Sequence, residues 1–321
     1  MRLNNKCHVI LYKNIILCLI ISLAGLISGC KGNSSVDVAS VDITTSNSDG
    51  RTNDITVLKP VASGELTISS PDALIDYSNA SEGYIVFTYT GGSSKVKLQL
   101  TGANQITYTY NIIPDNQTVI PLSQGSGDYD IAVYENIEND QYAMNMTDRI
   151  SVTITNEFGP FLYPNQYVYF DENFAAVKKA AELAKDASCD LEVVGRVYDF
   201  VINNVTYDHE EAETVASNYL PDVDEVMSTG KGICFDYASL MAAMLRSQGI
   251  PTRLEIGYAK DAYHAWISVY TKDLGWIGGV IKFDGTNWTL MDPTLASNSK
   301  DIGKIKDFIG DGSSYTVKYM Y

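Results

Sequence analysis

The chain has few positive charges, few histidines and few cysteines. Its 321 residues include 23 Lys and Arg against 39 Asp and Glu, with three His and five Cys. Residues 1–29 hold three basic and no acidic residues, so the remainder carries 20 basic and 39 acidic residues, a net charge of −19. A protein this acidic repels phosphate backbones, which argues against nucleic-acid binding. The few histidines have no zinc-like spacing, so we expect no metal, and no sequence motif indicates a cofactor.

Residues 1–30 have the features of an export signal that ends at a lipid-attachment site. Three basic residues precede an apolar run of 13 residues, 15–27, which is short for a membrane span and suits a signal peptide. The run leads into Ser28-Gly29-Cys30, which resembles the bacterial lipobox. We therefore expect removal of residues 1–29 and a lipid on Cys30 that holds the protein on the outer face of the cell membrane. The alternative is an ordinary signal peptide followed by a chance Cys.

Composition and hydrophobic pattern divide the rest of the chain into three parts. Residues 30–60 are rich in Ser, Asp, Asn and Thr, which predicts a flexible tether. Residues 61–158 show apolar residues at every second position in short runs separated by turn residues, which predicts a small Ig-like β-sandwich. The clearest runs are 84–89, 95–100, 106–110, 130–134 and 150–154. No chemistry is visible in this part, so a spacer or binding module is the expected role.

Residues 159–321 change to a mixed pattern and form the predicted catalytic domain. Helical spacing covers 174–187 and 191–203, and a third helix is expected to begin near Cys234. Residues 315–321 alternate cleanly and predict a last strand that closes the sheet of this domain, with tyrosines that serve packing.

Cys234 stands at the predicted start of that third helix. Gly230 and Gly232 permit a tight turn before it, and Gly249 with Pro251 ends the helix. A helix N-terminus stabilises a thiolate and offers N–H groups to an oxyanion. The alternative is a small buried core Cys, or a disulfide between Cys234 and Cys189.

A reactive thiol needs a base, and His264 is the better of two candidates. His209 lies in an acidic stretch, whereas His264 opens an alternating run, 264–270, that predicts a rigid strand. Asp292 follows a predicted strand, 286–291, and precedes Pro293. If that strand pairs beside the His264 strand, the Asp292 carboxylate can orient the imidazole. A surface histidine and an ordinary turn aspartate are the alternatives for these two residues.

The joint pattern resembles the transglutaminase-like superfamily over about residues 170–296. It is carried by Gly232-Ile233-Cys234-Phe235-Asp236-Tyr237-Ala238, by 245–253, by His264-Ala265-Trp266 and by Asp292-Pro293-Thr294. The resemblance implies an α+β, papain-like fold, a helix bundle packed on an antiparallel sheet. It also implies that Cys234 is the nucleophile, His264 the general base and acid, and Asp292 the orienting residue. The Cys234 N–H is the expected oxyanion donor, with Tyr207 as a weaker candidate for a second.

These features predict a cell-surface cysteine enzyme that transfers acyl groups from carboxamides or peptide carbonyls. A surface protein, a peptide or a cell-wall peptide is the expected substrate. Transamidation, deamidation and peptide hydrolysis share the thioester step, so the triad does not separate them. A cysteine peptidase of the same fold and a catalytically inactive surface binding or scaffold protein are the alternatives.

Overall fold

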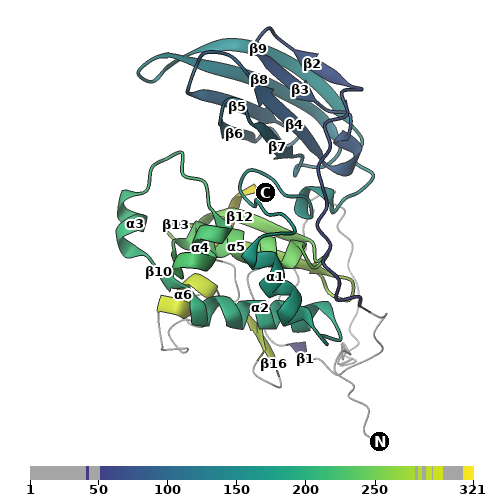
Figure 1. Cartoon of the computed structure of the whole chain (residues 1–321), viewed down its shortest axis with the longest axis vertical. Coiled ribbons are helices and arrows are strands. Elements are labelled where there is room, and N and C mark those ends of the chain that lie inside the picture. The colour runs from purple at the N-terminus through teal and green to yellow at the C-terminus, as the bar shows by residue number, and fades with distance from the viewer. Residues whose placement is uncertain (1–40, 43–50, 279–280, 284–286, 291, 299–313) are drawn as a thin grey trace, which may run out of the picture.

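The computed structural model describes residues 41–42, 51–278, 281–283, 287–290, 292–298 and 314–321. Two four-stranded sheets form the N-terminal part, and helices with further sheets form the C-terminal part (Figure 1). The predicted signal peptide and Cys30 lie outside the described residues. None of the described helices is long and apolar enough to cross a membrane.

The N-terminal part consists of two antiparallel sheets with strand orders β2-β3-β4-β7 and β6-β5-β8-β9. Buried apolar and partly exposed polar side chains alternate along strands such as β5, because one face of each sheet covers the core. The five predicted runs fall in β4, β5, β6, β8 and β9, whereas β2, β3 and β7 carry weaker patterns. The Ig-like assignment stays a prediction. The strands are β2 (Thr67–Ser69), β3 (Ala73–Asp76), β4 (Tyr84–Tyr89), β5 (Val96–Thr101), β6 (Thr107–Ile112), β7 (Gln117–Pro121), β8 (Gly127–Glu138) and β9 (Gln141–Val152).

The C-terminal part places helices against a four-stranded antiparallel sheet of order β14-β13-β12-β17. The α+β class predicted from the sequence is confirmed. The helices are α1 (Ala175–Ala184), α2 (Asp190–Asn204), α3 (His209–Thr214), α4 (Val223–Thr229), α5 (Cys234–Arg246) and α6 (Pro293–Asn298). The sheet consists of β12 (Thr252–Ala259), β13 (Ala262–Thr271), β14 (Gly275–Gly278) and β17 (Tyr315–Met320).

Helix α5 is the central element of this part. Eleven of its thirteen residues are buried, and it packs against α1, α2, β12 and β13. It begins at Cys234, as the sequence predicts, and β17 pairs with β12 as the predicted last strand. A short parallel pair of strands, β10 (Thr206–Tyr207) and β11 (Lys231–Gly232), immediately precedes the first turn of α5.

The strand before Asp292 does not pair as the sequence argument assumed. Strand β16 (Asn287–Leu290) pairs with β15 (Ile281–Phe283) and with β1 (Val41–Asp42), in a separate small sheet. The pairing with the His264 strand, on which the sequence-based placement of Asp292 was conditional, is therefore not the one observed.

Aromatic side chains join the two parts of the molecule. The rings of Tyr108 and Tyr110 on β6 meet Tyr321 at 5.4 and 6.0 Å between centroids, and Tyr110 stacks on Tyr167 at 5.8 Å. The Met320 N–H donates to the Tyr108 hydroxyl at 3.1 Å. Because these rings are buried, the two parts share one continuous core.

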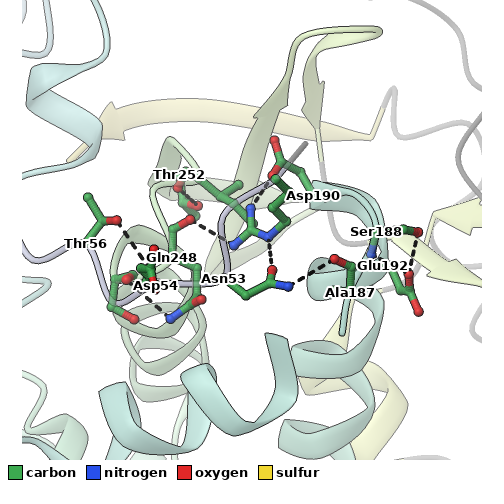
Figure 2. A network of polar contacts seen from close by, with 12 residues as sticks. Asn53, Asp54, Thr56, Ala187, Ser188, Asp190, Glu192, Gln248 and Thr252 are labelled. Carbon is green, nitrogen blue, oxygen red and sulfur yellow. Dashed lines mark hydrogen bonds and ion pairs between the residues drawn. The ribbon is translucent and has the colours of Figure 1, made fainter. Parts of the chain in front are cut away.

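An N-terminal strap, residues 51–57, fixes the chain before the first sheet to the far end of α5. The buried Arg51 guanidinium pairs with Asp190 and donates to the Gln248 carbonyl at 2.9 Å. The Asn53 amide donates to the Ala187 carbonyl (Figure 2), and the Thr56 N–H donates to Ser247 at 2.7 Å. These contacts give the last part of the predicted tether fixed partners, and the flexible tether over residues 30–60 stays a prediction. Its polar composition indicated no core, but its polar groups find partners on α2 and after α5.

Candidate active site

The turn into α5 gives Cys234 its position. Gly230 ends α4 at a φ of +64°, which favours glycine. A Cβ on Gly232 would lie 2.7 Å from the Cβ of Asp236, so no larger residue fits there. Asp236, which is fully buried, accepts hydrogen bonds from the Ile233 N–H at 2.8 Å and from the Tyr219 hydroxyl at 2.7 Å. Burial raises the pKa of Asp236 to about 6, against the opposing effect of these two hydrogen bonds.

Cys234 is a free thiol, partly exposed at the first position of α5. The alternative of a Cys189–Cys234 disulfide is therefore wrong, and so is that of a sealed core cysteine. Its backbone N–H has no acceptor within the helix and donates instead to the hydroxyl of half-buried Tyr207. Burial and the neighbouring Cys234 charge raise the pKa of Tyr207, whereas the N–H of Cys234 lowers it. Tyr207 thus touches the nucleophile position.

His264 lies on β13, between the thiol and Asp292. Its Nε2 is 2.6 Å from Asp292 Oδ2, and the two side chains are only 11% and 4% exposed. The ring also makes a hydrogen bond with Cys234. Because Nε2 is engaged by Asp292, Nδ1 is the atom left for the sulfur. The alternative of a surface histidine is wrong, because only 11% of the side chain is exposed.

The charge state of His264 follows from these partners. Burial alone would lower the pKa of His264, but the hydrogen bonds to Asp292 and Cys234 and their negative charges raise it to about 10. The positively charged form of His264 is therefore favoured at neutral pH.

Asp292 is held by α6. Its Oδ1 accepts from the Thr294 N–H at 2.9 Å and from the Leu295 N–H at 3.3 Å, and α6 begins at Pro293. Asp at the N-cap followed by Pro at the first helical position is a standard helix-start signal, and the sequence carries it here. The structure thus brings Cys234, His264 and Asp292 together although β16 and β13 are not neighbours.

Tyr315 is a site residue that the sequence argument missed. Its hydroxyl donates to Asp292 Oδ2 at 3.1 Å. It belongs to the terminal run for which we expected only packing roles. Nothing in the alternating pattern distinguishes it from Tyr319 or Tyr321, because only the pairing of β17 places it at the site.

His209 stays apart from the base position. It begins α3 and its ring meets Tyr207 at 5.0 Å, while Asp208 caps the helix through the Glu211 N–H. Among the residues that the structure describes, no group of three or more His, Cys, Asp or Glu could hold a metal ion.

Two proteins of known sequence are similar to part of this chain. The uncharacterized protein YebA of Bacillus subtilis is 29% identical over 145 residues, which are 39% of this chain and 19% of that protein. An uncharacterized protein of Mycobacterium leprae is 28% identical over 174 residues, 48% of this chain and 54% of that one. The match thus spans about a fifth and about half of these relatives' lengths.

A solved structure and a family model are also similar to parts of the chain. A Cytophaga hutchinsonii protein provisionally assigned as a cysteine protease aligns over 71% of this chain and 79% of its own, with 18% identity and a TM-score of 0.34. The model of the transglutaminase-like superfamily matches residues 177–278, which include Cys234 and His264 and end before Asp292. Residues 177–278 of this chain therefore form a domain of the transglutaminase-like superfamily.

Proposed function

We propose that the protein is a cysteine acyl-transfer enzyme in which Cys234 is the nucleophile, His264 the general base and acid, and Asp292 the orienting residue. The observation that carries the proposal is the buried 2.6 Å contact between His264 Nε2 and Asp292 Oδ2, in a ring that also hydrogen-bonds with Cys234. Asp292 fixes the ring and its tautomer, so that Nδ1 serves the sulfur.

The reaction has two halves. The Cys234 thiolate attacks the carbonyl carbon of a carboxamide or peptide, and a tetrahedral oxyanion forms. The carbon–nitrogen bond then breaks, and the His264 imidazolium gives its proton to the departing ammonia or amine. Water or a second amine attacks the resulting thioester while His264 accepts its proton. The sulfur leaves as a thiolate, and the imidazolium is restored.

The oxyanion has two candidate donors at the start of α5. The Cys234 N–H points at the Tyr207 hydroxyl in the free enzyme. A substrate carbonyl oxygen that replaces the Tyr207 oxygen as acceptor of this N–H could in turn receive a hydrogen bond from the Tyr207 O–H. Tyr207→Phe would then lower the rate of acylation, on the order of tenfold or more, without changing the pH dependence of Cys234 alkylation.

We also propose that the enzyme acts outside the cell, held by a lipid on Cys30. The basic residues, the short apolar run and the Ser28-Gly29-Cys30 sequence support this location. Its substrates would then be surface proteins, peptides or cell-wall peptides. Mass analysis of the N-terminal peptide of the membrane-extracted protein tests the anchor, since a cleaved and diacylated Cys30 is expected.

Alkylation of Cys234 tests the mechanism without knowledge of the substrate. At pH 6 an ordinary thiol of pKa about 8.5 is less than about 1% thiolate, so an ion-paired Cys234 should react with iodoacetamide up to about a hundredfold faster. His264→Ala should remove this advantage, while His209→Ala should keep it. A wild-type Cys234 that reacts no faster than a free thiol in a peptide contradicts the proposal and favours an inactive binding or scaffold protein.

Product analysis then separates the possible reactions. The protein is incubated with a glutamine-containing protein and a fluorescent primary amine, with Cys234→Ser as the control. Amine incorporation indicates transamidation, ammonia release without incorporation indicates deamidation, and new peptide termini indicate a peptidase. All three must disappear in the Cys234→Ser protein if Cys234 is the nucleophile.

A further inference from the structure

Tyr315 and His264 share one oxygen of the orienting carboxylate. Asp292 Oδ2 lies 2.6 Å from His264 Nε2 and 3.1 Å from the Tyr315 hydroxyl. We propose that Tyr315 is a positioning residue that tunes His264 through Asp292, by taking up part of the negative charge that the carboxylate would otherwise present to the imidazolium. This inference rests on the proposed function and assigns a fourth residue to the same site.

The Tyr315 ring is held in place independently of its hydroxyl. Tyr315 opens β17 opposite Ala259 on β12, and its ring packs edge-on against Trp266 at 5.1 Å between centroids. The Trp266 indole in turn stacks against the His264 ring at 6.1 Å. These contacts fix the direction of the hydroxyl, so that a phenylalanine at this position would keep the packing and lose only the hydrogen bond.

The Tyr315 hydroxyl stays protonated and therefore remains a hydrogen-bond donor. Burial raises its pKa, and the charge of Asp292 raises it further, so that the O–H keeps its proton throughout the neutral and mildly alkaline range. Its hydrogen bond to a carboxylate is charge-assisted and therefore stronger than a bond between neutral groups.

Asp292 does not need Tyr315 for its orientation. The N–H groups of Thr294 and Leu295 hold Oδ1, and His264 holds Oδ2. Tyr315 competes with His264 for Oδ2. Because two donors share this oxygen, each interacts with less of its negative charge. The His264 imidazolium is therefore a stronger acid with Tyr315 in place, and it gives its proton more readily to a leaving amine.

The other ionisable groups around the carboxylate and the ring are few. On the described residues, Cys234 from α5, Tyr315 from β17 and Tyr198 from α2 interact with the Asp292–His264 pair. Burial, then the charges of Asp292 and Asp199, raise the pKa of Tyr198, whose hydroxyl has no hydrogen-bond partner on the described residues. Tyr198 thus stays neutral, and Tyr315 is the group whose removal changes the charge on Oδ2.

The test compares Tyr315→Phe with wild type and with Tyr319→Phe as the matched control. Tyr319 lies on the same strand, and its ring packs against Tyr108 and Tyr321. The rate at which iodoacetate alkylates Cys234 in the full chain is followed from pH 5 to 11 by peptide mass analysis. Because iodoacetate is an anion, its rate falls as the His264 imidazolium loses its proton, so the alkaline limb reports the His264 pKa. A ¹⁵N NMR titration of the imidazole, assigned with His264→Ala, measures the same pKa directly.

We expect the alkaline limb of Tyr315→Phe to move up by about 0.5 to 1 pH unit, a three- to tenfold change in proton affinity. Tyr319→Phe should superimpose on wild type. A purely structural role would lower the thermal midpoint of Tyr315→Phe without moving the limb. An unchanged or lowered limb in Tyr315→Phe, with an activated Cys234 in wild type, overturns this inference and leaves the proposed function standing. A wild-type Cys234 with ordinary reactivity instead overturns the proposed function itself.

Discussion

The pKa of Asp236, near the start of α5, is raised by burial and lowered by hydrogen bonds, and its effect on stability can be measured. Its carboxylate is fully buried two residues after Cys234, and burial raises its pKa to about 6, well above the ordinary value of an aspartate. The folded protein therefore keeps this proton up to about pH 6, whereas the unfolded chain releases it near pH 4. The folded state binds more protons between these values, so the free energy of unfolding falls as the pH rises through this window.

The size of the effect follows from the shift. Two pKa units at about 1.4 kcal/mol each amount to about 3 kcal/mol of stability lost between pH 4 and pH 7.5. Asp236→Asn removes this titration. It also leaves one of the two donors, the Ile233 N–H or the Tyr219 hydroxyl, without an acceptor, which costs about 1 to 2 kcal/mol at every pH. The variant should therefore be less stable than wild type at pH 4 and more stable at pH 7.5.

Urea unfolding of wild type and Asp236→Asn at a series of pH values measures this crossing. Other titrating groups are common to both proteins and cancel in the difference. Asp261→Asn, at an exposed position in the β12–β13 turn, serves as the control and should follow wild type at every pH. Parallel curves for wild type and Asp236→Asn would show that Asp236 does not titrate in this window and would refute the reasoning.

Two further predictions concern the strap and the β12–β17 pairing. Arg51→Ala should lower the free energy of unfolding by about 2 to 3 kcal/mol. It removes the ion pair with Asp190 and the hydrogen bond to the Gln248 carbonyl, and leaves both acceptors without the guanidinium. Lys59→Ala, which breaks an exposed ion pair, should change it by less than about 0.5 kcal/mol in the same urea titration. Gly257→Ala should cost at least about 3 kcal/mol, because its Cβ would lie 2.0 Å from a carbonyl oxygen of β17. Gly92→Ala meets no atom within 4 Å and should be close to neutral; equal losses for both glycine variants would contradict the argument.

Features of the site that depend on short stretches of sequence could be predicted. The start of α5 follows from two glycines and an apolar stripe, and the His264 strand follows from its alternation. The pairing of β16 could not be predicted, because a strand's partner depends on contacts between distant segments and its own pattern fits several neighbours. The strap was missed for a related reason. A polar segment without an apolar stripe reads as unstructured, yet Arg51 and Asn53 find acceptors that only the folded helices present.

The position of Asp292 explains why the three proposed catalytic residues could be named although one step of the argument was wrong. The assumed pairing of β16 with β13 was unnecessary, because Asp292 is placed by the start of α6 and not by a sheet neighbour. Tyr315 has no such local cause. It reaches Asp292 only because β17 pairs with β12 through an irregularity between Ile256 and Gly257, which sets which tyrosine faces the carboxylate. Gly257 also pairs with His264 on the other side of β12. A substitution that displaces β17 should therefore disturb the charge on Asp292 as well as the stability of the sheet. The pH dependence of Cys234 alkylation in Gly257→Ala should therefore differ from that of wild type, through β17 and through the paired His264.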